Sequence, residues 1–325
     1  MACYLVAGAA GFIGSRISSL LLEQGHAVVG VDNLNDSYDP QVKRLRLERL
    51  LPLPGFTFHQ QDVRNLSALR EIFQQHPPVQ AVLNLAARAG VRQSVEDPWG
   101  FVDTNLVGTL NLLECCHQFE VPKFVFTSTS GVYGANPPLP TPETAESDHP
   151  RQPYAASKKA AEVMAHAYHS LYGIDVTIFR FFSVYGPYSR PDMVMFRFIQ
   201  WIAEGKSVKI FGDGGQTRAF THLEDVARGT ILGLKPLGYE IINLGGHESI
   251  SILEMARRIE MLVGRKADLQ FLPPNPADVR GNQADDAKAR CLLGWQPTIP
   301  LARGMEELVQ WYLAEREWTS KVLTP

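Results

Sequence analysis

The chain has 325 residues, of which 45% are apolar and 20% are charged, and its formal net charge is −3. This composition is typical of an ordinary globular protein with a sizeable core. The charge offers no basic stripe that could follow a phosphate backbone, so the sequence argues against a nucleic-acid partner.

Membrane, metal and export signals are also missing from the sequence. No apolar run approaches the roughly 18 residues that cross a bilayer. The chain passes at once from Met1 into a strand-like run and a glycine loop, unlike a signal peptide, so we expect a cytoplasmic protein without a membrane partner. The four cysteines show no metal-ligand spacing, so we interpret them as buried free thiols and expect no metal site.

The first half of the chain alternates short β-branched runs with helical patterns. Strands are predicted at 4–7, 27–31, 56–60, 81–85, 124–127 and 176–179. Helices are predicted near 12–24, 41–51, 66–75, 100–118 and 154–172. This alternation is typical of β-α-β units, so the predicted fold class is α/β, a doubly wound parallel sheet. The ligand of such a sheet binds in the loops that follow the strands.

The pattern changes after about residue 180, where Pro, Gly and Asp clusters appear. Helices are predicted near 192–204, 251–263 and 301–315, and short strands at 208–211 and 240–244. We therefore expect a first domain over 1–180 and a smaller carboxyl-terminal α/β substrate region over 181–325, interleaved with the first.

A glycine loop with the spacing G-x-x-G-x-x-G follows the first strand and opens a helix; its residues are Gly8, Gly11, Phe12, Ile13 and Gly14. Such glycines let the backbone approach a pyrophosphate at a helix N-terminus. Asp32 ends the second strand, where a carboxylate accepts both ribose hydroxyls and disfavours a 2′-phosphate, so NAD is the predicted cofactor. Asp62 and Val63, after the third strand, are placed to meet the adenine, although an acidic residue there is as often a helix cap.

A tyrosine and a lysine, Tyr154 and Lys158, lie on one face at the start of the helix predicted at 154–172. A phenol with a pKa near 10 is a poor base at neutral pH, and nearby positive charge favours its ionised form. Taken alone, this spacing is more often a solvated helix face. The hypothesis depends on its conjunction with the glycine loop.

Hydroxyl side chains follow the fifth strand at Thr127–Ser130 and should emerge beside the nicotinamide. One of them could hydrogen-bond a sugar hydroxyl and complete a proton path. The alternative is an ordinary Ser/Thr turn whose hydroxyls bond to nearby backbone.

In this order, these motifs resemble the extended short-chain dehydrogenase/reductase family over nearly the whole chain. Further matching stretches are 85–87, which holds Leu85, Ala86 and Ala87, then 104–109 with Asn105, 132–134, 180–182, 185–187 and 218–220. The resemblance implies a Rossmann-like domain that holds NAD, a smaller domain that holds a nucleotide sugar, and Tyr154, Lys158 and Thr129 as catalytic residues. Many members are homodimers paired through two helices, which here are those near 100–118 and 154–172.

Within the family, the hexose dehydratases carry an Asp-Glu pair where this chain has Thr129 and Ser130, and UDP-glucuronate decarboxylases usually carry Glu at the position of Gly131. The similarity to UDP-glucuronate 4-epimerases is greater. It includes the stretch 32–39 with Asn33, the stretch 89–92 with Arg92, and the stretch 190–193. The implied reaction interconverts UDP-glucuronate and UDP-galacturonate through a 4-keto sugar.

Arg190 carries a chemical argument for a sugar acid, because a guanidinium can hold a planar carboxylate through two hydrogen bonds. Its other interpretation is a structural ion pair. The remaining candidates for substrate contact are Thr127 and Ser128, Ser183 near Arg190, Lys209 in a strand that matches a uracil-binding strand, and the cations Arg218 and Arg280, which could equally be surface charges.

Two departures from the family pattern bear on these details. Asn84 stands where the family usually has His, and Pro276 lies in the stretch where a diphosphate-binding arginine is common, for which Arg280 could compensate. The alternatives that remain are an epimerase of UDP-glucose or UDP-N-acetylglucosamine, a UDP-glucuronate decarboxylase, and a catalytically silent NAD-binding sensor.

Overall fold

A computed structural model describes residues 1–246, 248–274 and 279–324. Its main element is a seven-stranded sheet with the order β10-β6-β5-β4-β1-β2-β3, in which every pair is parallel. The strands are β1 (Cys3–Ala7), β2 (Ala27–Asp32), β3 (Phe56–Gln60), β4 (Ala81–Asn84), β5 (Lys123–Thr129), β6 (Asp175–Phe181) and β10 (Tyr239–Leu244). The α/β prediction is confirmed.

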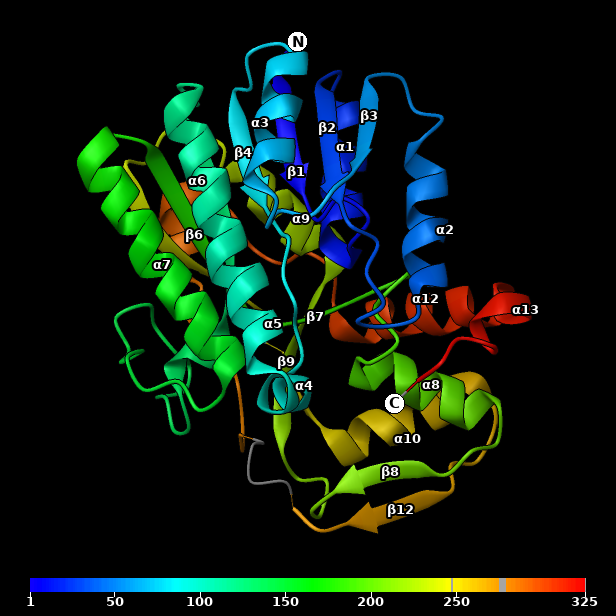
Figure 1. The fold of residues 1–325 in the computed structure, drawn as a ribbon. Helices are drawn as coiled ribbons and strands as arrows, with labels where there is room; N and C mark the ends of the chain where they lie inside the picture. Colours follow the sequence, from blue (N-terminus) through cyan, green and yellow to red (C-terminus); the bar gives the residue numbers. More distant parts are fainter. Residues whose placement is uncertain (247, 275–278, 325) are drawn as a thin grey trace.

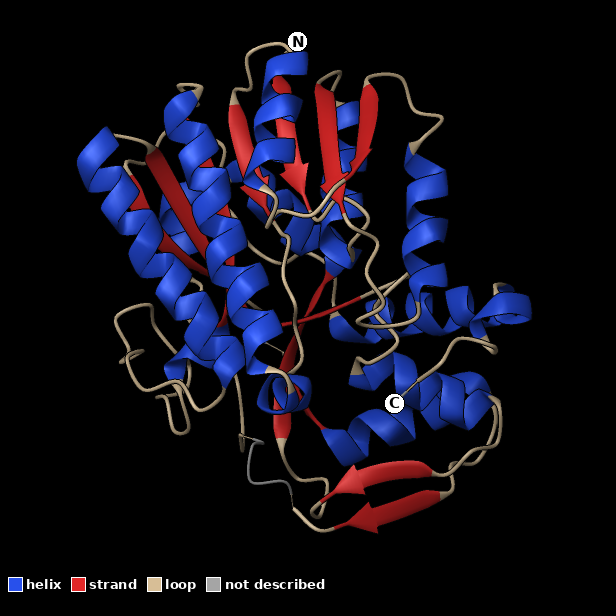
Figure 2. Ribbon diagram, in the orientation of Figure 1, coloured by secondary structure: helices blue, strands red, loops and turns tan. Residues whose placement is uncertain are grey.

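Helices cover both faces of this sheet (Figures 1 and 2). They are α1 (Phe12–Glu23), α2 (Pro40–Leu50), α3 (Leu66–Gln75), α5 (Pro98–Val102), α6 (Gly108–Gln118), α7 (Pro153–Tyr172), α9 (Leu223–Leu232) and α11 (Ala287–Leu293). Successive strand residues point to opposite faces, so Leu5 packs in a core with α3, α6 and α7, whereas Val6 packs in a second core with α1 and α9. Burial on both faces explains the near-continuous apolar runs of the strands.

The chain reverses its direction across the sheet between β1 and β4. From β1 it builds β2 and β3 on one side, and from β4 it builds β5 and β6 on the other. Loops that leave neighbouring strands in opposite directions open a crevice at their carboxyl ends. The fold therefore places a binding crevice beyond β1 and β4.

The carboxyl-terminal elements lie beyond that edge and form a third core (Figure 1). They are β7 (Ser183–Tyr185), α8 (Val194–Ala203), β8 (Val208–Phe211), β9 (Thr217–His222), β11 (Ser249–Ser251), α10 (Ile252–Val263), β12 (Leu269–Leu272), α12 (Leu301–Ala314) and α13 (Arg316–Thr319). They include a three-stranded sheet, β11-β9-β7, and a parallel pair, β12-β8. The short helix α4 (Val91–Glu96) packs against α5 and α7 instead. Strand β10 nevertheless joins the main sheet, so both halves of the chain build it; a boundary at residue 180 stays a prediction.

Three local features differ from the sequence prediction. The helix expected at 100–118 is broken into α5, a π-helical turn at Asp103–Val107, and α6. Strand β5 continues to Thr129 because that residue still pairs with Phe181 of β6. Cys291 is exposed on α11, whereas the other three cysteines are buried as expected. In the described part of the chain, no helix is long and apolar enough to cross a membrane.

Candidate active site

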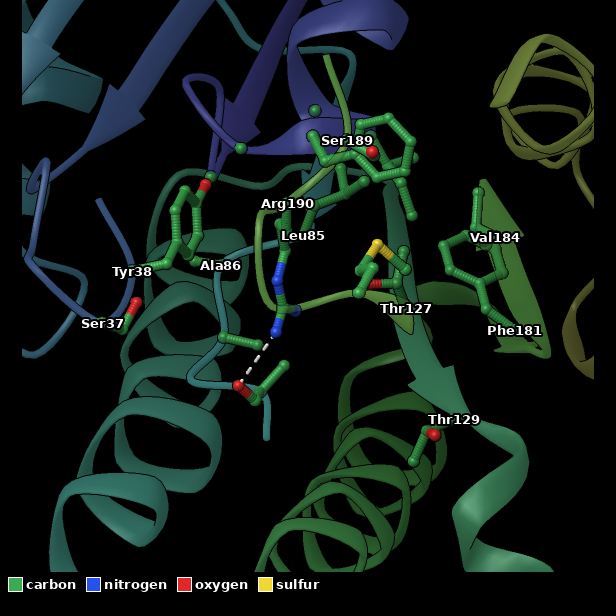
Figure 3. Close-up of a pocket in the computed structure, with 18 of the residues that line it drawn as sticks. Ser37, Tyr38, Leu85, Ala86, Thr127, Thr129, Phe181, Val184, Ser189 and Arg190 are labelled. Atoms are coloured by element: carbon green, nitrogen blue, oxygen red, sulfur yellow. Dashed lines mark hydrogen bonds between the residues drawn. The ribbon is translucent and has the colours of Figure 1, made fainter. Parts of the chain in front are cut away.

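A single cavity at the carboxyl edge of the main sheet receives residues from both halves of the chain (Figure 3). Of the predicted cofactor residues, its lining contains Gly8, Gly11, Phe12, Ile13, Gly14, Asp32, Asn33, Val63, Leu85, Ala86, Ala87, Tyr154 and Lys158. Of the predicted catalytic and substrate residues, it also contains Thr127, Ser128, Thr129, Ser183 and Arg190. The fold thus gathers in one cavity motifs that lie far apart in the sequence.

The glycine loop is a tight turn between β1 and α1. Gly8 adopts φ +83°, a left-handed conformation, and its N–H donates to the carbonyl of Val31 at 2.7 Å. A Cβ atom on Gly14 would lie 2.1 Å from the carbonyl oxygen of Gly8. Helix α1 begins after Gly11 without a side-chain cap, which leaves its first N–H groups available to an anion.

Asp32 closes the turn from the opposite side. Its carboxylate accepts the N–H of Ala10 at 3.1 Å and that of Leu34 at 2.9 Å, which fixes it at the end of β2. The adjacent Asn33 donates to Asp62 at 2.8 Å. Burial opposes the ionisation of Asp62, but hydrogen bonds from Arg64 and Asn33 outweigh it and hold the pKa of Asp62 at about 2. Asp62 thus supports Asn33 from outside the lining.

Asn105 lies outside the cavity lining, in the π-helical turn. Its amide donates to the carbonyl of Arg88 at 3.0 Å and to Ser157 at 2.9 Å, and it accepts the N–H of Arg88 at 2.9 Å. These bonds use both N–H donors of the amide and one of the two acceptor positions on its oxygen. In this structure Asn105 joins the loop after β4 to α7, and a direct contact with the cofactor stays a prediction.

Tyr154 stands in the first turn of α7 and faces Thr129 at the end of β5. Burial raises the pKa of Tyr154, whereas the positive charge of Arg190 and a hydrogen bond with Thr129 lower it. The side chain of Thr129 also accepts the N–H of Gly131 at 3.1 Å, which holds the hydroxyl in place. The arrangement is that of a phenol whose ionisation depends on nearby positive charge.

Lys158 lies one helical turn after Tyr154, and among the described residues its ammonium group has no hydrogen-bond partner. The side chain is 1% exposed, and its Nζ atom lies 4.2 Å from the centre of the Phe126 ring. Burial lowers the pKa of Lys158 to about 7, against the opposing charge of Glu162. The hydroxyl of Ser128 is likewise buried without a partner in the part of the chain described. Both groups line the cavity, so each is available to a ligand.

Arg190 reaches into the cavity (Figure 3). Its neighbour Asp192 occupies one side of the guanidinium. The Nε of Arg190 donates to Asp192 Oδ1 at 3.0 Å, and its Nη2 donates both to Asp192 Oδ2 and to the carbonyl of Ala89. Burial opposes the charge of Arg190, but Asp192 outweighs it and raises the pKa of Arg190. The side that could hold a substrate carboxylate through two bonds is therefore taken by Asp192, and Nη1 is left without a bond to any described residue.

The other predicted substrate cations lie outside the cavity lining. The guanidinium of Arg92 is 4.4 Å from the ring centre of Phe211, and Arg218 donates to the carbonyl of Val279 at 2.9 Å. Lys209 and Arg280 are exposed, on β8 and after the undescribed residues 275–278. Ser183 lines the cavity and accepts a hydrogen bond from Asn282 at 3.2 Å. The stretch around Pro276 lies outside the described residues.

Sequence reasoning missed several lining residues, namely Asn35, Ser37, Tyr38, Lys43 and Ser189. Lys43 is buried on α2, donates to Asn35 at 2.7 Å, and has its pKa lowered to about 8 by burial. A signal for it exists, because Lys43 and Arg46 stand in the apolar stripe that Leu47 and Leu50 continue. A cation in an apolar stripe is buried on folding, so it needs a polar partner or a ligand and is a candidate site residue.

The cavity fits a dinucleotide at three places. The glycine loop is a cradle that a Cβ atom would fill, Asp32 is fixed where a ribose would lie, and Lys158 is a buried cation that lacks a partner among the described residues. These residues would hold NAD, with Tyr154 and Thr129 beside its reactive end. No cluster of three or more metal-ligating side chains occurs within the described ranges.

The chain resembles known proteins in its sequence and its fold. Residues 4–245 match the profile described as "NAD dependent epimerase/dehydratase family". A UDP-glucuronate 4-epimerase from Thermodesulfobacterium geofontis is 51% identical over 312 residues, which cover 96% of each chain. The structure of a UDP-glucuronic acid 4-epimerase from Bacillus cereus with UDP-glucuronic acid and NAD aligns with a TM-score of 0.90 and 35% identity over 96% of this chain and 99% of that one.

A second solved structure, of a UDP-glucose 4-epimerase from Thermotoga maritima with UDP-glucose, aligns equally well, with a TM-score of 0.90 and 32% identity over 97% of this chain and 99% of that one. Similarity of this extent over nearly the whole length fixes the family together with the fold. The chain belongs to the NAD-dependent epimerase/dehydratase family, whose extended short-chain dehydrogenase/reductase motifs it carries.

Proposed function

We propose that this protein interconverts UDP-glucuronate and UDP-galacturonate by NAD-dependent epimerisation at C4 of the sugar. The relative that is 51% identical has this activity in its name, and the aligned Bacillus cereus enzyme holds UDP-glucuronic acid and NAD. One observation carries the assignment: Tyr154, Thr129 and Lys158 line the same cavity as the glycine cradle, and the charge of Arg190 acts on the phenol of Tyr154. The ammonium of Lys158 has no hydrogen-bond partner among the described residues.

Tyr154, Thr129 and Lys158 have different roles in the proposed reaction. The phenolate oxygen of Tyr154 takes the proton of the C4 hydroxyl, and Thr129 holds that hydroxyl in line. The C4–H and O–H bonds break while the C4=O bond forms, and the same steps in reverse on the other face give the epimer. Bound NAD supplies the hydride acceptor and a positive charge near the phenol. Lys158 adds a donor for the cofactor ribose and, when protonated, a second charge that favours the phenolate.

We propose that Arg190 acts in two ways. Its charge counteracts the effect of burial, which raises the pKa of Tyr154, and so favours the phenolate that a catalytic base requires. Arg190 also receives the sugar carboxylate. The carboxylate bonds to Nη1 alone, or it displaces Asp192 and bonds to two nitrogens of the guanidinium. A 4-keto uronic acid is a β-keto acid that loses CO2 readily, so the carboxylate must be held in an unreactive orientation. Arg190 and the hydroxyls at Thr127 and Ser128 are the candidates.

Product analysis tests the proposal directly. The purified protein is incubated with UDP-glucuronate, and the nucleotide sugars are separated. UDP-galacturonate is expected, whereas a UDP-pentose with CO2 would make the protein a decarboxylase. Conversion of UDP-glucose to UDP-galactose in a parallel sample would favour a neutral-sugar epimerase, which the aligned Thermotoga maritima structure keeps as the second candidate. No product and no change in nicotinamide absorbance with any UDP-sugar would favour an NAD-binding sensor.

We also propose a homodimer paired through α5, α6 and α7. Large apolar side chains are exposed on these helices: Trp99 is 76% exposed and Leu171 is 71% exposed. Apolar patches of this kind mark association surfaces. Light scattering should give twice the chain mass, and Leu171→Glu should give a monomer. A cytoplasmic location is proposed from the free cysteines, since no disulfide occurs among the described residues.

A further inference from the structure

Ser189 carries a buried hydroxyl that the proposed chemistry does not use. The side chain is 2% exposed, and among the described residues its Oγ atom has no hydrogen-bond partner. It belongs to the cavity lining, in the loop between β7 and α8 (Figure 3). A buried hydroxyl is normally hydrogen-bonded, so one that faces a cavity without a partner indicates a ligand atom there.

Arg46 of α2 holds this loop against the glycine loop. Its Nε and Nη2 atoms donate to the carbonyl of Tyr188 at 2.9 and 2.6 Å, and its Nη1 donates to the carbonyl of Ala10 at 3.2 Å. The same Nη1 donates to the hydroxyl of Tyr38 at 2.7 Å. One guanidinium therefore joins the glycine loop, the loop after β2 and the loop that carries Ser189.

The residue before Ser189 has a strained backbone, and its bonds to Arg46 explain how the strain is maintained. Tyr188 adopts φ +58°, a left-handed conformation that residues other than glycine rarely take. Its carbonyl is the group that Arg46 grips with two N–H donors. Strain of this kind persists where surrounding bonds over-determine the backbone, and it often positions a functional group. Here the group that follows directly is the hydroxyl of Ser189.

We propose that Ser189 donates a hydrogen bond to the diphosphate of NAD, and that Arg46 is the residue that positions it. The N–H groups of α1 and the glycine loop contact the diphosphate from one side, and Ser189 closes the opposite side. The three other serines that line the cavity are less suitable. Ser183 accepts a hydrogen bond from Asn282 at 3.2 Å. The hydroxyl of Ser37 is already donated to Asn35 at 2.7 Å, and Ser128 lies at the end of β5, at the Tyr154 end of the cavity. The inference requires only the NAD site and does not depend on which sugar is the substrate.

The test measures exchange of NAD from the holoenzyme with labelled NAD, in Ser189→Ala and Ser189→Thr. Loss of one hydrogen bond to a charged group should speed exchange, or weaken NAD affinity, by about ten- to a hundredfold in Ser189→Ala. Ser189→Thr keeps the hydroxyl and should remain within a few-fold of the wild type. Thr230→Val is the control, because it removes a buried hydroxyl that is bonded to the carbonyl of Val226 within α9.

Three results would overturn the assignment of Ser189. Ser189→Ala could exchange NAD at the wild-type rate. The Thr variant could be as impaired as the Ala variant, which would make the hydroxyl irrelevant. Affinity for UDP could fall with NAD exchange unchanged, which would place the hydroxyl on the sugar nucleotide instead.

Arg46→Met tests the positioning role with a readout that Ser189→Ala does not share. It should speed NAD exchange and also raise KM for the sugar nucleotide, because Arg190 lies in the same loop, whereas Ser189→Ala should leave KM unchanged at saturating NAD. Arg44→Met, at an exposed position of the same helix, is the control. Normal exchange and normal KM in Arg46→Met would refute the positioning role; should that variant fail to fold, the two Ser189 variants still decide the proposal.

Discussion

Two buried cations lie along helix α7 in very different surroundings. Lys158, at its cavity end, and Arg180 of β6, beside its middle, are each 1% exposed. Arg180 donates to both oxygens of Glu162, at 3.0 and 2.7 Å, and stacks 4.8 Å from the ring centre of Tyr133. Lys158 has only the ring of Phe126 and no hydrogen-bond partner among the described residues.

This difference in pairing distinguishes Arg180, a structural residue, from Lys158, a residue of the candidate site. A buried cation with a bidentate carboxylate is fully compensated, and it locks α7 onto β6. A buried ammonium without a hydrogen-bond partner lowers the free energy of unfolding. It is retained where a bound ligand accepts its hydrogen bonds. The same helix thus anchors the sheet through Glu162 and carries Tyr154 and Lys158, the residues proposed for the reaction.

The largest effect is expected at the cavity end. Tyr154→Phe removes the only proton-accepting atom proposed for C4 and should lower kcat by about 10²–10⁴, which single-turnover assays with UDP-glucuronate can measure. Tyr168→Phe is the matched change on the same helix, where the hydroxyl bonds to Glu114 away from the cavity. It should keep kcat. An equal loss of kcat in the two variants would show that the two ends of α7 do not differ in function.

The scaffold is tested next, at Glu162. Glu162→Gln leaves the charge of Arg180 without its buried carboxylate and should lower the free energy of unfolding by about 3–5 kcal/mol. Denaturant unfolding monitored by fluorescence measures this. Glu254→Gln, which breaks the exposed pair with Arg258 on α10, should cost well under about 1 kcal/mol. A small effect at Glu162 would mean that α7 does not depend on the buried pair.

The unpaired state of Lys158 predicts a pH dependence of stability. Burial lowers the pKa of Lys158 from 10.5 to about 7. Between these values the unfolded chain binds a proton at this lysine that the folded protein largely lacks, so its contribution to the free energy of unfolding increases as the pH rises. In protein freed of NAD, the Tm of the wild type minus that of Lys158→Met should therefore grow from pH 7 to pH 10. A difference that stays constant or shrinks would show that Lys158 has a partner in solution.

Arg190 should give a smaller, selective effect. Arg190→Met should raise KM for UDP-glucuronate by about tenfold, the loss of one charged hydrogen bond, with less change for UDP-glucose. Its kcat profile should also shift to higher pH, because the positive charge that lowers the pKa of Tyr154 is gone. Initial rates from pH 6 to pH 10 measure both. Full activity on UDP-glucuronate would refute the carboxylate contact.

The smallest effects are expected at the predicted cations that lie outside the cavity lining. Arg280→Met and Lys209→Met should change KM for UDP-glucuronate by less than about twofold, since both side chains are exposed. Initial rates over a range of UDP-glucuronate concentrations give the KM of each variant. A larger rise would mean that the carboxyl-terminal elements close over the sugar nucleotide when it binds.

The sequence by itself determined six of the seven strands of the main sheet and the glycine turn after the first of them. Six strands, the turn at Gly8 and Gly14, and the spacing of Tyr154 and Lys158 arise from local rules: short apolar, β-branched runs, the conformational freedom of glycine, and the turn of a helix. These patterns extend over a few residues, and they are visible without the fold.

Only the tertiary structure decided which charges and hydroxyls reach the cavity. Arg46 meets the carbonyl of Tyr188, 142 residues away, and Ser189 becomes a lining residue through that contact. Asp192 takes the Nε and Nη2 side of Arg190, the residue that the sequence suggested for a sugar carboxylate. The physical reason is that the direction and pairing of a long polar side chain depend on which distant loop packs against it, which no local pattern records.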